Sequence, residues 1–290
     1  MTDWKQTTLT LGHSPDPDDA FMFYAMAEEK IDLRGYRFEH MLQDIQTLNE
    51  RATRGELHIS AVSIHALARV LDRYALLPSG ASMGNGYGPM FVTHGEAPTG
   101  TDADRRAWLL GRGRTIAVPG LMTSAFLAAR LFLGAEFRHI VVPFDQIFDA
   151  VRAGRADAGL LIHEGQLTYA MEGFSLILDL GEWWKRTRGL PLPLGGNVVR
   201  KDIPPAVRRE IRDILHESIA YGLAHRAPAV GHSMAQARGM DTPLADRFIG
   251  MYVNELTLDY GDEGREAVSR FLGEAADAGL IPAKPMIEFV

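Results

Sequence analysis

His163, in the segment LLIHEG, is the residue whose type and position best suit chemistry. It follows an apolar run that predicts a buried strand, and open α/β sheets bind ligands at the carboxyl ends of their strands. A neutral histidine there could remove a proton from a substrate near pH 7. The same position also suits a half-buried histidine with a purely structural hydrogen bond, so both interpretations stay open. Glu164 is the adjacent candidate for substrate binding.

A second candidate segment is SPDPDDAF, which begins at Ser14 and follows the first predicted strand. Asp16 and Pro17 are typical of a helix start, and Asp18 and Asp19 favour the positive end of a helix. This structural role explains most of the segment. If the carboxylates instead face a cleft, they would repel an anionic group and suit hydroxyls or a sugar-like part of a ligand. We therefore treat Ser14, Asp18 and Asp19 as candidate substrate-binding residues.

The segment VPGLMTSAF predicts a strand, a tight turn at Gly120 and a helix that starts near Thr123 and Ser124. A helix start offers free N–H groups and partial positive charge, which can bind a carboxylate or a phosphate. Plain N-capping by a hydroxyl explains the same pattern. Capping and anion binding are compatible, so Thr123 and Ser124 are candidate binding residues.

Several other chemistries lack support in the sequence. The chain has no cysteine, which excludes disulfides, thiolate metal sites and cysteine nucleophiles. No histidine pair or carboxylate–histidine cluster has metal-ligand spacing, and neither a Walker A sequence nor GxSxG is present. The glycines of SGASMGNGYGP precede a predicted strand, whereas a dinucleotide fingerprint opens a helix. We expect no cofactor and no metal.

The other histidines are less well placed. His13 lies at the end of the first predicted strand and is a second candidate for chemistry, and His65 lies near the matching strand end after Ser63. The remaining seven show no constellation with other reactive residues: His40, His58, His94, His139, His216, His225 and His232.

Length and composition describe an ordinary globular chain. It has 290 residues, of which 46% are hydrophobic and 23% charged; at roughly 150 residues per domain this predicts about two domains. Lys and Arg number 30 against 37 Asp and Glu, a net charge of −7, and nucleic-acid binding as the main function would need a basic face. No stretch approaches the ~18 apolar residues of a membrane span, and no secretory signal is visible. We expect a cytoplasmic protein with neither a nucleic-acid nor a membrane partner.

Strand and helix segments alternate along the chain, which predicts an α/β fold with a mainly parallel sheet. The expected strands are 7–12, 36–42, 57–62, 90–93, 115–119, 140–143, 157–163 and 175–180. The expected helices are 16–29, 44–54, 63–72, 123–134, 145–153 and most of the chain from 204 onward. Residues 95–113 are expected to form an exposed connection, and 189–196 a loop rich in proline and glycine.

A weak internal similarity suggests two lobes. A helix, a glycine stop and a buried strand recur at Gly55 with LHISAV and at Gly154 with DAGLLI, although such units recur in any α/β protein. Two similar lobes would place a ligand in the cleft between them. The glycine-rich stretches 79–89 and 189–196 would then carry the chain across. The expected first lobe is 1–93 plus 193–290, and the expected second lobe is 94–192.

The sequence also resembles a known family. It is similar to the menaquinone-biosynthesis enzymes of the futalosine route, among them the 1,4-dihydroxy-6-naphthoate synthases, and the similarity spans nearly the whole chain in the family's order. The stretches that carry it are SPDPDDAFMFYA, LQDIQTLNERA, GYGPMFV, VPGLMTSAF, GLLIHEGQLTY, LGEWWKRTRGLPLPLG and YVNELTLDYGDEG. The resemblance implies a two-lobed fold of the type II periplasmic-binding-protein kind, with an interlobe cleft and a helical C-terminal region.

The resemblance implies an activity as well. Such an enzyme is a cofactor-free carbon–carbon lyase that acts on cyclic dehypoxanthine futalosine and releases 1,4-dihydroxy-6-naphthoate with a small sugar-derived fragment. Its small-molecule substrate has a carboxylate and a sugar-like part. His163 matches the family's proposed base, and the helix start at Thr123 and Ser124 matches the part that receives polar or carboxylate groups. Positions that match cleft-lining stretches of the first lobe are Ser60, Ser63, Gly86, Tyr87 and Gly88.

The chain departs from the family pattern near the first strand. Asp16, Asp18 and Ala20 stand where the family commonly has Cys, Asn and Thr, and Ala61 stands where some members have a polar or basic residue. These changes leave open a paralogue with a different substrate preference. Two alternatives also stay open: a non-catalytic solute-binding protein, and a sister enzyme that dehydrates chorismate. The acidic segment makes the second less attractive, because chorismate carries two carboxylates.

Overall fold

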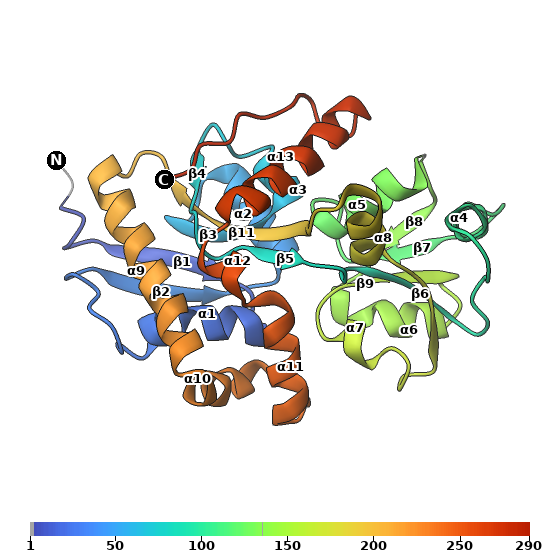
Figure 1. The fold of residues 1–290 in the computed structure, drawn as a ribbon, viewed down its shortest axis with the longest axis horizontal. Coiled ribbons are helices and arrows are strands. Elements are labelled where there is room, and N and C mark those ends of the chain that lie inside the picture. The colour runs from blue at the N-terminus through green and yellow to red at the C-terminus, as the bar shows by residue number, and fades with distance from the viewer. Residues whose placement is uncertain (1–2, 135) are drawn as a thin grey trace. The chain divides into compact units, whose positions relative to one another are not determined.

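The computed structural model describes residues 3–134 and 136–290, and the chain forms two compact units (Figure 1). Unit 1 comprises residues 1–83, 193–269 and 285–290, and unit 2 comprises 84–192 and 270–284. The chain thus passes from one unit to the other four times. Residues 84–93 fall in unit 2, whereas the sequence placed them in the first lobe, because the strand at 90–94 pairs with two strands of unit 2.

The sheet of unit 1 has the strand order β2-β1-β3-β11-β4, with β5 paired to β11. Its strands are β1 (Thr8–His13), β2 (Arg37–Leu42), β3 (Ile59–Ser63), β4 (Tyr74–Leu76), β5 (Ser82–Gly84) and β11 (Leu192–Arg200). Strand β1 runs parallel to β2 and β3, whereas β11 runs antiparallel to β3 and β4. The sheet is therefore mixed, and the prediction of a mainly parallel sheet is wrong.

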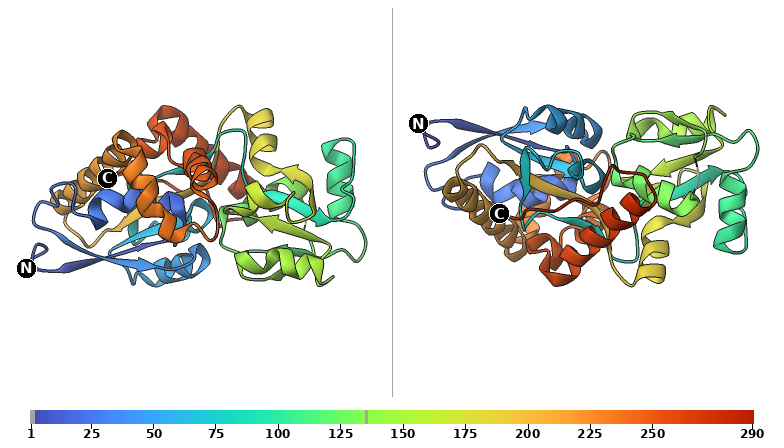
Figure 2. Two further views of the ribbon diagram at one scale, coloured as in Figure 1. Left: turned by 90° about the horizontal axis from the view of Figure 1, so that it is seen from below. Right: turned by 90° about the horizontal axis from the view of Figure 1, so that it is seen from above.

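Helices of unit 1 cover this sheet and form the C-terminal region. They are α1 (Pro17–Ala27), α2 (Ile45–Arg54), α3 (Ile64–Leu67), α9 (Pro205–Ala224), α10 (Arg226–Ser233), η2 (Met234–Gln236), α11 (Thr242–Tyr252), α12 (Glu255–Leu258) and the start of α13 (Gly261–Asp277). Helix α2 ends at Gly55, whose φ of 69° gives the left-handed cap that the sequence predicted. Figure 2 shows α9, α10 and α11 gathered around α1.

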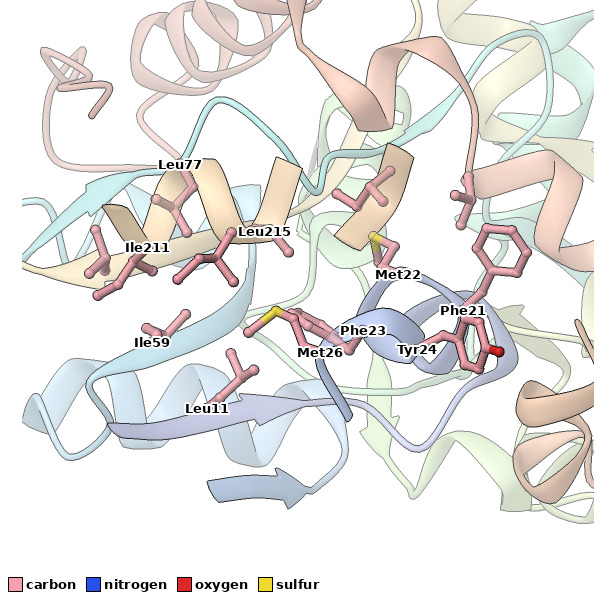
Figure 3. Packing of buried hydrophobic residues seen from close by; sticks show 14 of the residues in the cluster. Leu11, Phe21, Met22, Phe23, Tyr24, Met26, Ile59, Leu77, Ile211 and Leu215 are labelled. Carbon is pink, nitrogen blue, oxygen red and sulfur yellow. The ribbon is translucent and has the colours of Figure 1, made fainter. Parts of the chain in front are cut away.

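The core of unit 1 explains why α1 is apolar on nearly every face. Phe21, Met22, Phe23, Tyr24 and Met26 are all buried, as expected of a helix enclosed by other elements. Figure 3 shows these side chains packed with residues of the sheet and of α9. The first turn of α1 is thereby held against the carboxyl end of β1, where the candidate residues lie.

The five-stranded sheet of unit 2 has the order β10-β6-β9-β7-β8. Its strands are β6 (Met90–His94), β7 (Ile116–Val118), β8 (His139–Val141), β9 (Ala158–Leu161) and β10 (Phe174–Asp179). Its helices are α4 (Asp102–Leu109), α5 (Ser124–Leu133), η1 (Phe144–Gln146), α6 (Ile147–Arg152), α7 (Gly165–Thr168), α8 (Leu180–Arg188) and the end of α13. Strand β7 is parallel to β8 and β9, and β6 is antiparallel to β9 and β10. Figure 1 shows α5 and α8 on one side of this sheet, and α6 and α7 on the other.

Three predicted segments are wrong in detail. Residues 95–113 contain α4, whose start is fixed by a capping box between Thr101 and Asp104. The helix expected at 63–72 ends after one turn, and 189–196 contains the first half of β11 rather than a loop. Gly196 of β11 has a packing reason, because a Cβ there would lie 2.3 Å from the Tyr260 hydroxyl oxygen. Within the described residues, no helix has the length and apolar character needed to cross a lipid bilayer.

Candidate functional site

The candidate residues of unit 1 gather at one edge of its sheet. Strands β1 and β3 are parallel neighbours, with Leu11 opposite Ile59 and Gly12 opposite Ser60. The carboxyl ends of parallel neighbours meet at the same edge, so the residues that follow β1 and those that end β3 emerge together.

Ser14 follows β1 and is buried within a network of polar groups. Its N–H donates to Asp19 Oδ2 at 2.7 Å, and its hydroxyl donates to Asp16 Oδ2. The other oxygen of Asp16 lies 2.7 Å from Nη1 of Arg238, which also donates through Nη2 to the Pro15 carbonyl oxygen at 3.0 Å. The segment after β1 is therefore fixed by carboxylates from α1 and by an arginine from the C-terminal region.

His13 supports the same segment from the strand side. Its Nδ1 lies 3.1 Å from the carbonyl oxygen of Ser14, and a carbonyl oxygen can only accept, so Nδ1 holds the proton. Its Nε2 lies 3.0 Å from Nδ1 of His40, and its ring stacks on Phe23 at 4.5 Å. Burial, followed by the neighbouring His40, lowers the pKa of His13 to about 3, which makes it neutral at pH 7. The prediction that His40 takes part in no constellation is wrong.

Carboxyl groups dominate the electrostatics of this edge. Burial and the negative charge of Asp16 raise the pKa of Asp19 to about 7, so its carboxyl group titrates close to neutral pH. Asp18 lies half-buried in the first turn of α1. Such an edge disfavours an anionic ligand group and suits hydroxyl groups.

Two serines of β3 complete the candidate set of unit 1. The Ser60 hydroxyl donates to the Ala61 carbonyl oxygen at 2.9 Å. Ser63 forms a reciprocal pair with Asn49 of α2, since Asn49 Nδ2 donates to Ser63 Oγ at 3.0 Å and Ser63 N–H donates to Asn49 Oδ1 at 2.8 Å. Asn49 is fully buried, so α2 positions the end of β3 directly.

The candidate residues of unit 2 lie at the matching edge of the second sheet. Strands β7 and β9 are parallel neighbours, with Ile116 opposite Ala158 and Ala117 opposite Gly159. The turn that leads to Thr123 follows β7, and the segment with His163 follows β9. Both sets therefore leave the sheet at the same edge.

Thr123 is the N-cap of α5. Its hydroxyl donates to the Gly120 carbonyl oxygen at 2.9 Å and accepts from the Phe126 N–H at 3.1 Å. Ser124 is the first residue of the helix, and both side chains are buried. These contacts establish the capping role, while anion binding by Thr123 and Ser124 stays a prediction.

His163 lies two residues beyond the end of β9, just before the short helix α7. The residue as a whole is half-buried, its ring centroid lies 4.2 Å from that of Phe144, and the two ring planes are tilted by 54°. Its φ of 62° is left-handed, which is uncommon for a residue with a side chain. The N–H of Gln166 donates to the His163 carbonyl oxygen at 3.2 Å, and Glu164 is half-buried beside it. Backbone strain of this kind persists where the surroundings over-determine it, often at functional sites.

The glycine segment between β5 and β6 has a packing explanation. A Cβ on Gly88 would lie 3.0 Å from the backbone nitrogen of Gly181, which opens α8. Asp179 caps that helix by accepting from the Gly181 N–H at 2.7 Å and the Glu182 N–H at 3.0 Å. Burial raises the pKa of Asp179 to about 6, and burial also raises the pKa of Tyr87. Gly86, whose φ is 85°, turns the chain before them. The role of Gly86, Tyr87 and Gly88 in binding stays a prediction.

The residues that hold these candidates in place were not predicted from the sequence. Asn49 is a polar residue on the buried face of α2, and Asp179 precedes the helix of LGEWW; both could have been found as a buried polar residue and an N-cap. Phe144 and Arg238 reach their partners only through the tertiary fold. Among the described residues, no group of three or more His, Asp or Glu side chains is placed to hold a metal ion.

Comparison with known proteins places the chain in a family. Residues 9–277 match a family model described as menaquinone biosynthesis. The chain belongs to this menaquinone-biosynthesis family. Two relatives are named 1,4-dihydroxy-6-naphtoate synthase. The protein of Thermus thermophilus is 36% identical, and the match covers 97% of this chain and 99% of the relative. The protein of Streptomyces coelicolor is 38% identical, and the match covers 95% of each chain.

Solved structures agree with this placement. A crystal structure of an Archaeoglobus fulgidus protein is 40% identical, with a TM-score of 0.87, and covers 94% of this menaquinone-biosynthesis family member and 98% of its own chain. An alkanesulfonate-binding protein of Xanthomonas axonopodis has a TM-score of 0.70 at 13% identity, covering 97% and 96% of the two chains. The second likeness concerns the fold alone, and it confirms the predicted fold of the periplasmic-binding-protein kind.

Proposed function

We propose that the protein is a 1,4-dihydroxy-6-naphthoate synthase, a carbon–carbon lyase that converts cyclic dehypoxanthine futalosine into 1,4-dihydroxy-6-naphthoate and a small sugar-derived fragment. The observation that carries this proposal is the match to two relatives of that name, at 36% and 38% identity over at least 95% of the chain. The polar strand ends of the two units are consistent with a substrate that has both hydroxyl and carboxylate groups.

His163 is the general base in this proposal. Its support is its place after β9, the contact of its ring with Phe144 and its left-handed backbone. A neutral His163 removes a proton from a hydroxyl or an activated carbon of the substrate. A C–C bond of the cyclic sugar-derived part then breaks, and an aromatic ring forms, which supplies driving force. Positioned general-base catalysis contributes ~10²–10⁴-fold, and orientation of the substrate supplies further acceleration.

The remaining candidates bind the substrate in this proposal. Thr123 and Ser124 receive the carboxylate, because the start of α5 offers N–H groups and partial positive charge. Ser14 and Asp19 receive hydroxyls of the sugar-like part, since a carboxylate would be repelled by the carboxyl groups there. Further contacts are assigned to Asp18, Ser60, Ser63, Gly86, Tyr87, Gly88 and Glu164.

The test of the function is direct conversion. The protein is incubated with cyclic dehypoxanthine futalosine, and the mixture is analysed by mass spectrometry for 1,4-dihydroxy-6-naphthoate. We expect time-dependent product without an added cofactor. Tight binding of the compound without conversion would favour a solute-binding protein. Turnover of chorismate in a parallel assay would instead identify the sister dehydratase.

A further inference from the structure

Arg238 contacts the Ser14 segment of unit 1 although it lies 223 residues after Pro15 in the chain. It belongs to the connection between η2 and α11. Its Nη1 lies 2.7 Å from Asp16 Oδ1, and its Nη2 donates to the Pro15 carbonyl oxygen at 3.0 Å. The planar guanidinium thus holds both a side chain and the backbone of one short segment, a geometry that a lysine cannot reproduce.

Burial strengthens the electrostatic attraction within this ion pair. The Asp16 side chain is 5% exposed and the Arg238 side chain 27%, so water screens their attraction only weakly. Arg238 has a φ of 45°, and Gly239 after it has a φ of 85°. A left-handed arginine is disfavoured unless its surroundings hold it in place. The connection therefore adopts a strained conformation at the residue that contacts Asp16.

Asp16 transmits this restraint to Ser14. Its second oxygen, Oδ2, accepts the hydrogen bond that the Ser14 hydroxyl donates. A hydroxyl has a single proton, so once that proton is donated the oxygen can only accept further hydrogen bonds. The Ser14 backbone is fixed as well, since its N–H donates to Asp19 and its carbonyl oxygen accepts from His13.

We propose that Arg238 is a positioning residue for substrate binding: it holds Asp16 so that Asp16 accepts the hydrogen bond from the Ser14 hydroxyl, and the Ser14 oxygen is left as an acceptor for a hydroxyl of the substrate. This inference rests on the proposed function, which supplies a substrate with a sugar-like part. A substrate hydroxyl can donate a hydrogen bond to the Ser14 oxygen. A carboxylate or carbonyl group has no proton to donate, so it could not bond to this oxygen. Arg238 therefore acts on binding through Ser14 and does not touch the substrate.

The test is a double-mutant cycle on turnover of cyclic dehypoxanthine futalosine. We expect Ser14→Ala and Arg238→Met each to lower kcat/KM about tenfold, mainly by raising KM, because the first removes the acceptor and the second removes what orients it. If Arg238 acts through Ser14, kcat/KM of the double variant should be within twofold of that of the less active single variant. Independent structural damage would instead multiply the two losses.

Arg226→Met is the matched control. Arg226 pairs with Asp246 at 2.8 Å in the same helical region of unit 1. Its loss removes an arginine–aspartate ion pair, although a more exposed one, without touching Asp16, and kcat/KM should stay within twofold of wild type. Should Arg238→Met fail to fold, Arg238→Lys serves in the same cycle. Multiplying losses, or an Arg238→Met variant with wild-type kinetics, would overturn the positioning role alone. A wild-type protein that does not convert the compound would remove the proposed function and this role with it.

Discussion

In unit 1 the polar groups that follow β1 bond to one another, whereas in unit 2 Thr123, after β7, bonds to backbone groups and His163, after β9, packs against Phe144. Ser14 is bonded to Asp16, Asp19 and His13. His163 instead sits in a left-handed turn against Phe144. Both sets lie at the carboxyl ends of two neighbouring parallel strands. The carboxyl edges of the two sheets therefore differ: that of unit 1 carries a network of carboxyl groups around Ser14, and that of unit 2 carries His163, for which we propose the catalytic role.

The contrast between the two histidines gives the largest expected effect. His163→Gln should lower turnover by ~10²–10⁴-fold, the contribution of a positioned base, while the melting temperature stays near that of wild type. His13→Gln should lower the melting temperature, because His13 is buried and bonded on both ring nitrogens. Thermal unfolding and product formation, measured on both variants, check this. If His163→Gln lowers the melting temperature as much as His13→Gln does, His163 would have a structural role like that of His13, which would contradict the difference between the two sheet edges.

A second prediction concerns the pH dependence of stability in unit 1. The pKa of His13 is about 3 in the folded protein, below its ordinary 6.5. Between these two pH values the His13 side chain is protonated in the unfolded chain and neutral in the folded chain. Its contribution to the free energy of unfolding therefore falls as pH drops from about 6.5 towards 3, by on the order of 4 kcal/mol. Denaturant unfolding of wild type and His13→Gln between pH 4 and 7 should show a flatter curve for the variant. The same pH dependence of the unfolding free energy in both proteins would contradict the lowered pKa of His13.

Asp19 changes the stability of the protein with pH in the opposite direction to His13, over an overlapping pH range. Its folded pKa of about 7 lies above the ordinary 3.8, so its contribution to stability is complete below about pH 4 and is lost as pH rises through 7. Asp19→Asn should therefore gain stability relative to wild type between pH 5 and 8. The same denaturant series measures it, and a variant that loses relative stability across that range would show that Asp19 is ionised in the folded protein.

The Asn49–Ser63 pair should give a smaller effect. Asn49→Ala leaves the buried Ser63 N–H without its Asn49 acceptor, which costs about 1–3 kcal/mol of unfolding free energy. An Asn49→Ala variant as stable as wild type would show that another group takes over the Ser63 N–H.

Loss of the α5 cap should give the smallest effect on stability. Thr123→Ala removes the acceptor of the Phe126 N–H, which costs about 1 kcal/mol, and Thr123→Ser should restore it. If Thr123 also binds the substrate carboxylate, the alanine variant raises KM while the serine variant does not. Equal KM values for all three proteins would limit Thr123 to capping.

Much of this arrangement follows from local sequence signals. The stops at Gly55 and Gly154, the helix start after Thr123 and the strand before His163 are all encoded within a few residues, and the structure has them. The first half of strand β11 was not predicted, because its prolines and glycines are typical of a loop. Its pairing with β3 begins at Gly195. Its place in the sheet is decided by the partner strands.

The network around Ser14 could be predicted only in part. The sequence places Ser14, Asp16 and Asp19 together because they are neighbours in the chain. The contacts of Arg238 and His40 with this segment join residues far apart in sequence, and no local pattern encodes them. The same holds for Phe144 against His163, where only the packing of η1 beside the end of β9 brings the rings together.

His163 is proposed to remove a proton from the substrate in the reaction. The most direct test follows 1,4-dihydroxy-6-naphthoate by mass spectrometry in single-turnover reactions of wild type and His163→Ala with cyclic dehypoxanthine futalosine, with and without added imidazole. We expect rapid product with wild type, none with the variant, and slow product from the variant when imidazole supplies a base. Product formation by His163→Ala at the wild-type rate would contradict the account.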